Sequence, residues 1–130
     1  MTSDDFQKLV QEGIDVIPAR FLARLSNVAF VVEDRPSAEQ IEKKGTRRRS
    51  FLLGLYEGIP LTERGSEYGF VLPDKITIFK REIEDYAKDE KDIPDIVKDT
   101  VWHEVAHYFG MDEAEVREKE KRNKKRNRLR

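Results

Sequence analysis

The only two histidines of the chain lie four residues apart, in the segment His103-Glu104-Val105-Ala106-His107. On an α-helix, residues four apart lie one turn above each other on the same face, so two imidazoles can converge on one cation. The chain has no cysteine, so any metal must be bound by His, Asp or Glu side chains. The His-Glu-x-x-His pattern is typical of catalytic zinc sites, and we expect His103 and His107 to bind Zn²⁺.

Glu104 follows the first histidine and lies next to the face that carries both imidazoles. Its carboxylate can take a proton from a metal-bound water instead of binding the metal. Zinc lowers the pKa of such a water toward neutrality, so a carboxylate is a sufficient base. We therefore predict that Glu104 is the general base. The alternative is an ordinary pair of surface or core histidines, which the complete pattern disfavours because it rarely arises by chance.

A hydrolytic zinc site normally has three protein ligands and one exchangeable water, so a third ligand is needed here. Glu113 is the first choice, because a left-handed Gly110 would end the helix and turn the chain back toward the metal. Asp112 is the competing candidate. Asp112 could instead cap a following helix, and Glu113 could be a favourable charge in the first turn of that helix.

One helix must position these groups, and the sequence predicts it from Asp92-Ile93-Pro94 to Phe109. Pro94 is tolerated in a first turn, and Gly110 is a typical terminator. One stripe of the helix is polar or small and is expected to face the site: Thr100, His103, His107 and Gly110. The flanking residues are apolar and are expected to face the core: Val97, Val101, Val105, Ala106 and Phe109.

The upstream elements are predicted from apolar periodicity. Helical spacing over residues 6–17 and 21–25, interrupted by Pro18, predicts two N-terminal helices. β-branched and aromatic runs predict a mostly buried strand over 28–32 and a second strand over 51–56. A third strand is centred on Ile76 and Ile78, with Pro73-Asp74-Lys75 as a turn before it.

The remaining segments are shorter. A short helix is predicted over 37–44, a long loop over 57–69 and a helical segment over 81–88. The Arg47-Arg48-Arg49 patch is expected to be a solvated loop, and Asp112 with Glu115 resembles the start of a last helix. These elements predict an α/β (α+β) chain.

Length and charge favour one domain with a basic tail. The chain has 130 residues and is 39% charged, so we expect one domain over 1–117 and a tail over 118–130 that is a helical extension or disordered. Residues 116–130 carry nine Lys or Arg and two Glu, a net charge of +7, which leaves the remainder at −8 within the total of −1. The tail lacks interleaved aromatics, so binding of nucleic acid or an acidic partner is the less favoured interpretation.

The N-terminus has neither a basic n-region nor an apolar h-region, and no apolar run approaches the length of a membrane span. We therefore expect a cytoplasmic protein without a membrane partner, and a monomer by default.

The stretch HEVAHYFGMDE, residues 103–113, resembles the H-E-x-x-H-x-x-G-x-x-D motif of minimal bacterial zincin-like metallopeptidases. The resemblance covers about residues 4–117 and includes three upstream stretches: IPARFLARLSNVAFVVED (17–34), LLGLYEGIPLTER (52–64) and LPDKITIFKREIE (72–84). It implies a zincin-like fold in which a small mixed sheet of about three to four strands packs on the N-terminal helices and the motif helix. It also implies a cleft at the sheet edge, where an extended peptide could add as a strand.

Two departures from related patterns concern the ligands. Glu113 stands where the family pattern has Asp, and its side chain is one methylene longer. The third histidine of metzincins is absent, and no Met follows Met111 to form a Met-turn. The chain is therefore not expected to be an ordinary metzincin.

These observations predict a zinc-dependent metallopeptidase that hydrolyses peptides or unfolded proteins with Zn²⁺ as cofactor. The alternative is a catalytically weak zinc-binding or adaptor module, because a minimal domain has few elements with which to build substrate pockets. Tyr56, Tyr68 and Tyr108 are candidates for stabilising the developing oxyanion, although packing is the favoured interpretation of each.

Overall fold

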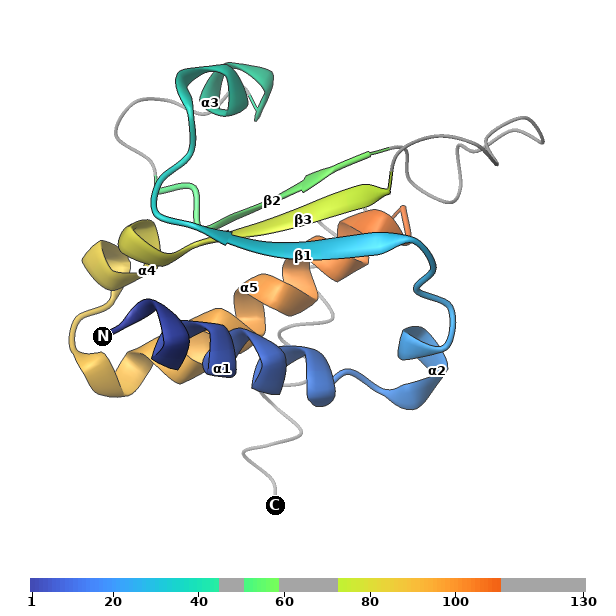
Figure 1. The fold of residues 1–130 in the computed structure, drawn as a ribbon, viewed down its shortest axis with the longest axis horizontal. Helices are drawn as coiled ribbons and strands as arrows, with labels where there is room; N and C mark the ends of the chain where they lie inside the picture. Colours follow the sequence, from blue (N-terminus) through green and yellow to red (C-terminus); the bar gives the residue numbers. More distant parts are fainter. Residues whose placement is uncertain (45–50, 59–72, 111–130) are drawn as a thin grey trace.

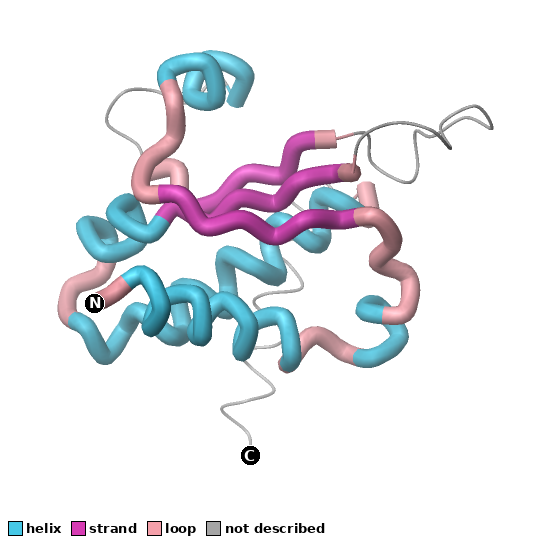
Figure 2. The backbone as a smooth tube through the Cα atoms, in the orientation of Figure 1, coloured by secondary structure: helices cyan, strands magenta, loops and turns pink. Residues whose placement is uncertain are grey.

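The computed structural model describes residues 1–44, 51–58 and 73–110 of the chain. It contains helices and strands that are packed in layers (Figures 1 and 2). The elements are α1 (Ser3–Asp15), α2 (Ala19–Leu22), β1 (Val28–Glu33), α3 (Ala38–Lys44), β2 (Gly54–Glu57), β3 (Asp74–Phe79), α4 (Lys80–Tyr86), a 3-10 helix (Glu90–Asp92) and α5 (Ile93–Tyr108). The predictions for the Arg47-Arg48-Arg49 patch, the segment 59–69, the helix after the motif and the tail lie outside the described residues.

The three strands form one mixed sheet in the order β1-β3-β2. β1 is parallel to β3, with Val28 opposite Asp74, and β2 is antiparallel to β3, with Gly54 opposite Ile78. α1 and α5 cover one face of the sheet, and α3 lies on the other side (Figure 1). This architecture confirms the predicted α+β class and the small mixed sheet.

The main core lies between the sheet and the two long helices. Ile76 and Ile78 of β3 are fully buried against Phe6 of α1 and the buried valines of α5. Fully burying an apolar side chain of this size contributes about 1.5–3 kcal/mol. The α1 and α5 helices therefore stay on the sheet because their apolar stripes meet there, as the periodicity of both segments predicted.

Local sequence accounts for the boundaries of the helices. Thr2 caps α1, because its hydroxyl accepts from the Asp5 amide at 3.1 Å. Before α3, the Gln40 amide donates to Ser37 Oγ at 3.1 Å and the Ser37 amide donates to Gln40 Oε1 at 2.9 Å, which is a capping box. The two N-terminal helices, the helix over 37–44 and the helical segment after residue 80 were all predicted, and the structure confirms them.

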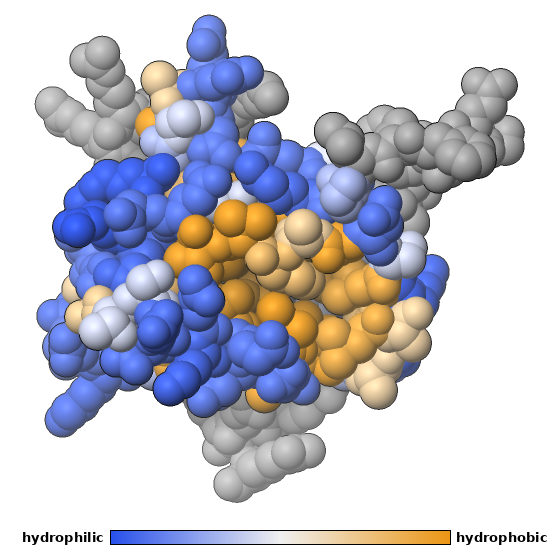
Figure 3. All heavy atoms as spheres, viewed as in Figure 1, coloured by the Kyte–Doolittle hydropathy of each residue, from blue (hydrophilic) through white to orange (hydrophobic). Residues whose placement is uncertain are grey.

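The first strand was predicted to be mostly buried, and the structure leaves it less enclosed than the other two strands, with no residue fully exposed. All six residues of β1 are only partly buried, because β1 is an outer strand of the sheet and no neighbour covers its free edge among the described residues. Figure 3 shows the consequence: apolar surface gathers between β1 and the helices below it. Val28, Phe30 and Val32 pack on the core from this partly open position.

The other two strands have different limits from those predicted. The second strand begins at Gly54 instead of Phe51. Asp74 and Lys75, predicted to form a turn, belong to β3. Asp74 is 3% exposed, its amide donates to the Asn27 carbonyl at 3.0 Å, and its carboxylate accepts from the Tyr56 hydroxyl at 2.8 Å. Because of these hydrogen bonds to residues distant in the chain, Asp74 lies in the strand although aspartate is typical of turns.

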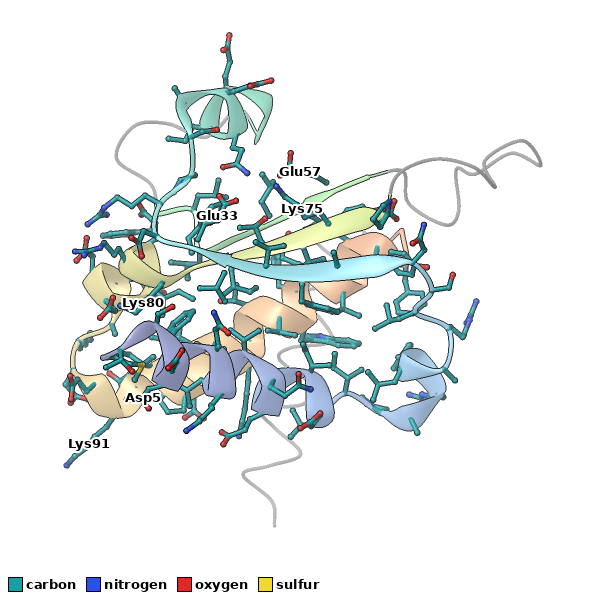
Figure 4. All side chains as sticks on the ribbon, in the orientation of Figure 1. Asp5, Glu33, Glu57, Lys75, Lys80 and Lys91 are labelled. Atoms are coloured by element: carbon teal, nitrogen blue, oxygen red, sulfur yellow. The ribbon has the colours of Figure 1, made fainter. Side chains whose placement is uncertain are left out.

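Charged side chains cross the face of the sheet that points toward α3 (Figure 4). Lys75 of β3 lies 3.9 Å from Glu33 of β1 and 3.9 Å from Glu57 of β2. Gln40 of α3 donates to Glu57 at 3.0 Å. This face is therefore polar around Lys75, whereas the opposite face carries the main core. A smaller buried cluster of Leu52, Leu55 and Phe79 lies further along the same face as Lys75. Within the described ranges, none of the helices combines the length and the apolar character needed to cross a bilayer.

Candidate metal centre

The C-terminal half of α5 brings the two histidines together. The ring centroids of His103 and His107 are 4.8 Å apart, with an interplanar angle of 70°. One candidate ligand atom from each of His103, Glu104 and His107 lies within 4.8 Å of the other two. The helical spacing thus produces the convergence that it predicted, with a carboxylate beside the two imidazoles.

The α5 helix begins and ends as its sequence predicts. Pro94 lies in the first turn. At the other end, the Gly110 amide donates to the His107 carbonyl at 2.9 Å, and Gly110 adopts a left-handed φ of 82°. A glycine takes this conformation without steric penalty. The helix therefore ends at Tyr108, one residue after the second histidine.

The two faces of α5 differ as predicted except at Thr100. Val97, Val101 and Val105 are fully buried in the core, and both histidines are partly buried. Thr100, predicted to belong to the stripe facing the site, is 7% exposed, and its hydroxyl donates to the Ile96 carbonyl at 2.7 Å. Thr100 therefore packs against the sheet and does not offer its hydroxyl to the centre.

Glu104 is buried beneath the sheet. It is 3% exposed, and its Oε1 atom accepts a hydrogen bond from the Tyr56 amide of β2 at 2.9 Å. A buried carboxylate is strongly destabilising unless hydrogen-bond donors replace its water. The backbone of β2 supplies such a donor, so the strand and the motif helix share one polar contact at the centre.

Gly54 allows that contact. A Cβ atom at residue 54 would lie 2.7 Å from Thr100 Cγ2 and 3.2 Å from Glu104 Cγ. The strand can approach α5 this closely only because residue 54 has no side chain. A glycine within a strand pattern is itself a signal of close backbone approach, and it could have drawn attention to this position in the sequence.

The donor set fits a zinc ion. Zinc binds imidazole nitrogen and carboxylate oxygen, and catalytic sites use three protein ligands. In the part of the chain that the structure describes, His103, Glu104 and His107 form the one group of three metal-binding side chains that converge. Glu113 and Asp112, the two candidates for the third ligand, lie outside the described residues.

Two of the three candidate tyrosines have hydroxyl groups directed at other partners. The Tyr56 hydroxyl donates to Asp74 Oδ2 at 2.8 Å. Tyr108 is fully buried, and its hydroxyl lies 3.4 Å from both the backbone nitrogen and the carbonyl oxygen of Ser26. Tyr68 is outside the described residues. The sequence singled out the Tyr56 side chain, whereas the structure brings its backbone amide to the centre.

Comparison with known proteins provides independent information. A family model described as zincin-like metallopeptidase matches residues 25–122. Among solved structures, a conserved hypothetical protein from T. thermophilus is similar, with 23% sequence identity and a TM-score of 0.57 over 84% of this chain and 94% of that chain. At this identity the similarity shows the fold alone. No curated protein matches the chain significantly.

Proposed function

Because the chain belongs to the zincin-like metallopeptidase family, we propose that it is a zinc-dependent peptidase in which Glu104 is the general base. His103 and His107 are two of the zinc ligands, and Glu113 is the third, with Asp112 as its competitor. The observation that carries the proposal is the convergence of His103, Glu104 and His107 within 4.8 Å. A family match alone would leave open whether this chain retains such a centre.

The chemistry divides between the ion and the chain. Zinc, when bound, lowers the pKa of a coordinated water toward neutrality and polarises the substrate carbonyl. Glu104 accepts a proton from the attacking water and then delivers it to the leaving amine. The burial of Glu104 strengthens its electrostatic interactions with the reacting groups.

An extended peptide is the substrate class that the fold favours. β2 is an outer strand of the sheet, and it contacts α5 at Glu104. The edge of an outer strand can accept a peptide as an additional strand, here at positions other than the Tyr56 amide, which is bound by Glu104. Short or unfolded peptides can adopt this conformation, whereas a folded protein must first release a segment of its chain.

The test compares zinc content and peptide cleavage in the wild type and Glu104→Gln. The substituted glutamine keeps the shape of the side chain and an oxygen for the Tyr56 amide, but it cannot accept the proton. We expect this variant to bind zinc like the wild type and to cleave a peptide library about 10²–10⁴-fold more slowly. His103→Ala is the matched variant that should lose both zinc and cleavage.

Three results would count against the proposal. A wild type that binds no zinc would remove the metal centre, and undiminished cleavage by Glu104→Gln would remove the assigned base. Zinc binding by the wild type without cleavage of any peptide would favour the alternative, a zinc-binding or adaptor module with little turnover.

A further inference from the structure

The backbone N–H of Tyr56 points away from β3, the strand that is paired with β2. In an antiparallel pair, hydrogen-bonded and non-hydrogen-bonded residue pairs alternate. The Phe79 amide donates to the Leu53 carbonyl at 2.9 Å, so Leu53 is at a hydrogen-bonded position, and in the β2–β3 register Leu55 is at the next one. Tyr56, opposite Ile76, is therefore at a non-hydrogen-bonded position. Its N–H faces away from β3 and is directed at Glu104 instead.

The β2 strand contacts Glu104 at two points. The side-chain stem lies against Gly54, where a Cβ atom would be 3.2 Å from Glu104 Cγ. The carboxylate is bound by the Tyr56 amide at 2.9 Å. The backbone of β2 thus restrains the direction of the side chain from both its aliphatic and its charged end.

This restraint matters because two roles are within reach of the same carboxylate. Its oxygen lies within 4.8 Å of ligand atoms of both His103 and His107. A small rotation would therefore let Glu104 bind an ion held by the two imidazoles, as carboxylates readily do. A carboxylate bound to the ion is a much weaker base for the attacking water, because the cation stabilises its negative charge. Some feature of the chain must decide between the two roles.

We propose that the backbone amide of Tyr56 is a positioning group that holds the Glu104 carboxylate on the β2 side of the centre and off the metal. The inference rests on the proposed function, since it concerns how the assigned base is kept from becoming a ligand. The restraint is assigned to the N–H group, since the Tyr56 ring packs on Tyr108 and the Tyr56 hydroxyl donates to Asp74.

The N–H group can be removed by Tyr56→Pro. Proline is tolerated in outer strands where the lost N–H is not part of the ladder, as at residue 56. Tyr56→Ala is the matched control, because it also loses the ring and hydroxyl but keeps the amide. Because proline also fixes φ, a difference between the two variants is assigned to the amide only where removing the Glu104 carboxylate abolishes it.

Visible absorption of the Co²⁺-loaded protein reports ligand number and type independently of turnover. We expect Tyr56→Ala to retain the wild-type spectrum and Tyr56→Pro to show altered bands, because Glu104 joins the metal. Adding Glu104→Ala to Tyr56→Pro should restore the wild-type bands. Zinc-dependent cleavage by Tyr56→Pro should fall about tenfold or more below that of Tyr56→Ala, the ratio that corresponds to loss of one hydrogen bond to a charged group.

A second measurement covers the case in which Tyr56→Pro does not fold. In the metal-free wild type, hydrogen exchange of the Tyr56 amide should be slow, and Glu104→Ala should accelerate it about tenfold or more. The Leu55 amide, at a position bonded to β3, should not change. Fast exchange at Tyr56 in the wild type would overturn the inference.

The outcomes separate this inference from the proposed function. Identical cobalt spectra for Tyr56→Pro and Tyr56→Ala overturn the positioning role and leave the peptidase proposal intact. A wild type that binds cobalt but cleaves no peptide overturns the peptidase proposal, and the spectra still decide the role of the amide. A wild type that binds neither zinc nor cobalt overturns both.

Discussion

Gly54 and Thr100 approach each other so closely that a Cβ atom at residue 54 would lie 2.7 Å from Thr100 Cγ2. The threonine cannot easily rotate away, because its hydroxyl is bonded to the Ile96 carbonyl at 2.7 Å and β-branched side chains have few rotamers on a helix. This contact sets how near β2 comes to α5. It therefore also sets the distance over which the Tyr56 amide must reach Glu104.

Gly54→Ala should destabilise the protein by about 1–3 kcal/mol, the usual effect of overpacking a close contact. The helix must move away from the strand, so zinc affinity should fall as well. Urea unfolding followed by circular dichroism measures the first effect, and a competitive zinc titration measures the second.

Gly13→Ala is the matched control for Gly54→Ala. Gly13 also faces α5, but a Cβ atom there would be 3.4 Å from Val101 Cγ2, which is an ordinary contact. Alanine in the helix should be neutral or stabilise the protein by up to about 1 kcal/mol. Equal destabilisation by the two substitutions would show that the close approach of β2 to α5 does not exclude a side chain at residue 54.

Removal of the metal should lower the stability of the folded chain. A ligand that binds only the native state stabilises it by about 2.7 kcal/mol at a concentration of about 100 times its Kd. The melting temperature should therefore rise with added zinc and fall back with a chelator. His103→Ala should melt at the same temperature with and without zinc, and a zinc-dependent rise in that variant would contradict the assignment of His103.

The third ligand can be identified by comparing Glu113→Gln with Asp112→Asn. We expect Glu113→Gln to weaken zinc binding by more than the about 10–100-fold that loss of a ligand's hydrogen-bond partner costs. Asp112→Asn should have a much smaller effect, because asparagine also caps helices well. The reverse order of the two affinities would transfer the ligand role to Asp112.

Gly110→Ala should destabilise the protein by about 1–2 kcal/mol, because alanine is strained at the left-handed φ of 82°. Gly110→Asn should destabilise it less, since asparagine tolerates this conformation better than other residues with a side chain. Chemical denaturation of the three proteins gives the comparison. If alanine and asparagine have the same effect, the backbone conformation at residue 110 is not the cause.

Most of the helices and strands could be predicted from local stretches of the sequence. Pro94 and Gly110 mark the ends of α5, and Pro18 separates α1 from α2, because helix boundaries depend on residues within one turn. The three strands were recognisable from their β-branched runs, although their limits were not. Asp74 joins β3 through hydrogen bonds with Asn27 and Tyr56, which are distant in the chain and leave no local signal.

In the candidate centre, too, one feature was determined by the sequence and others only by the tertiary structure. The pairing of His103 with His107 was determined by the sequence alone, because residues four apart on a helix necessarily share a face. Tertiary structure alone decided that Tyr56, 48 residues earlier in the chain, supplies the amide that binds Glu104. It also decided that Gly54 lies against Thr100 and that β1 is an outer strand of the sheet within the described residues. These relationships depend on strand order and register, which result from packing the whole chain and not from any one segment.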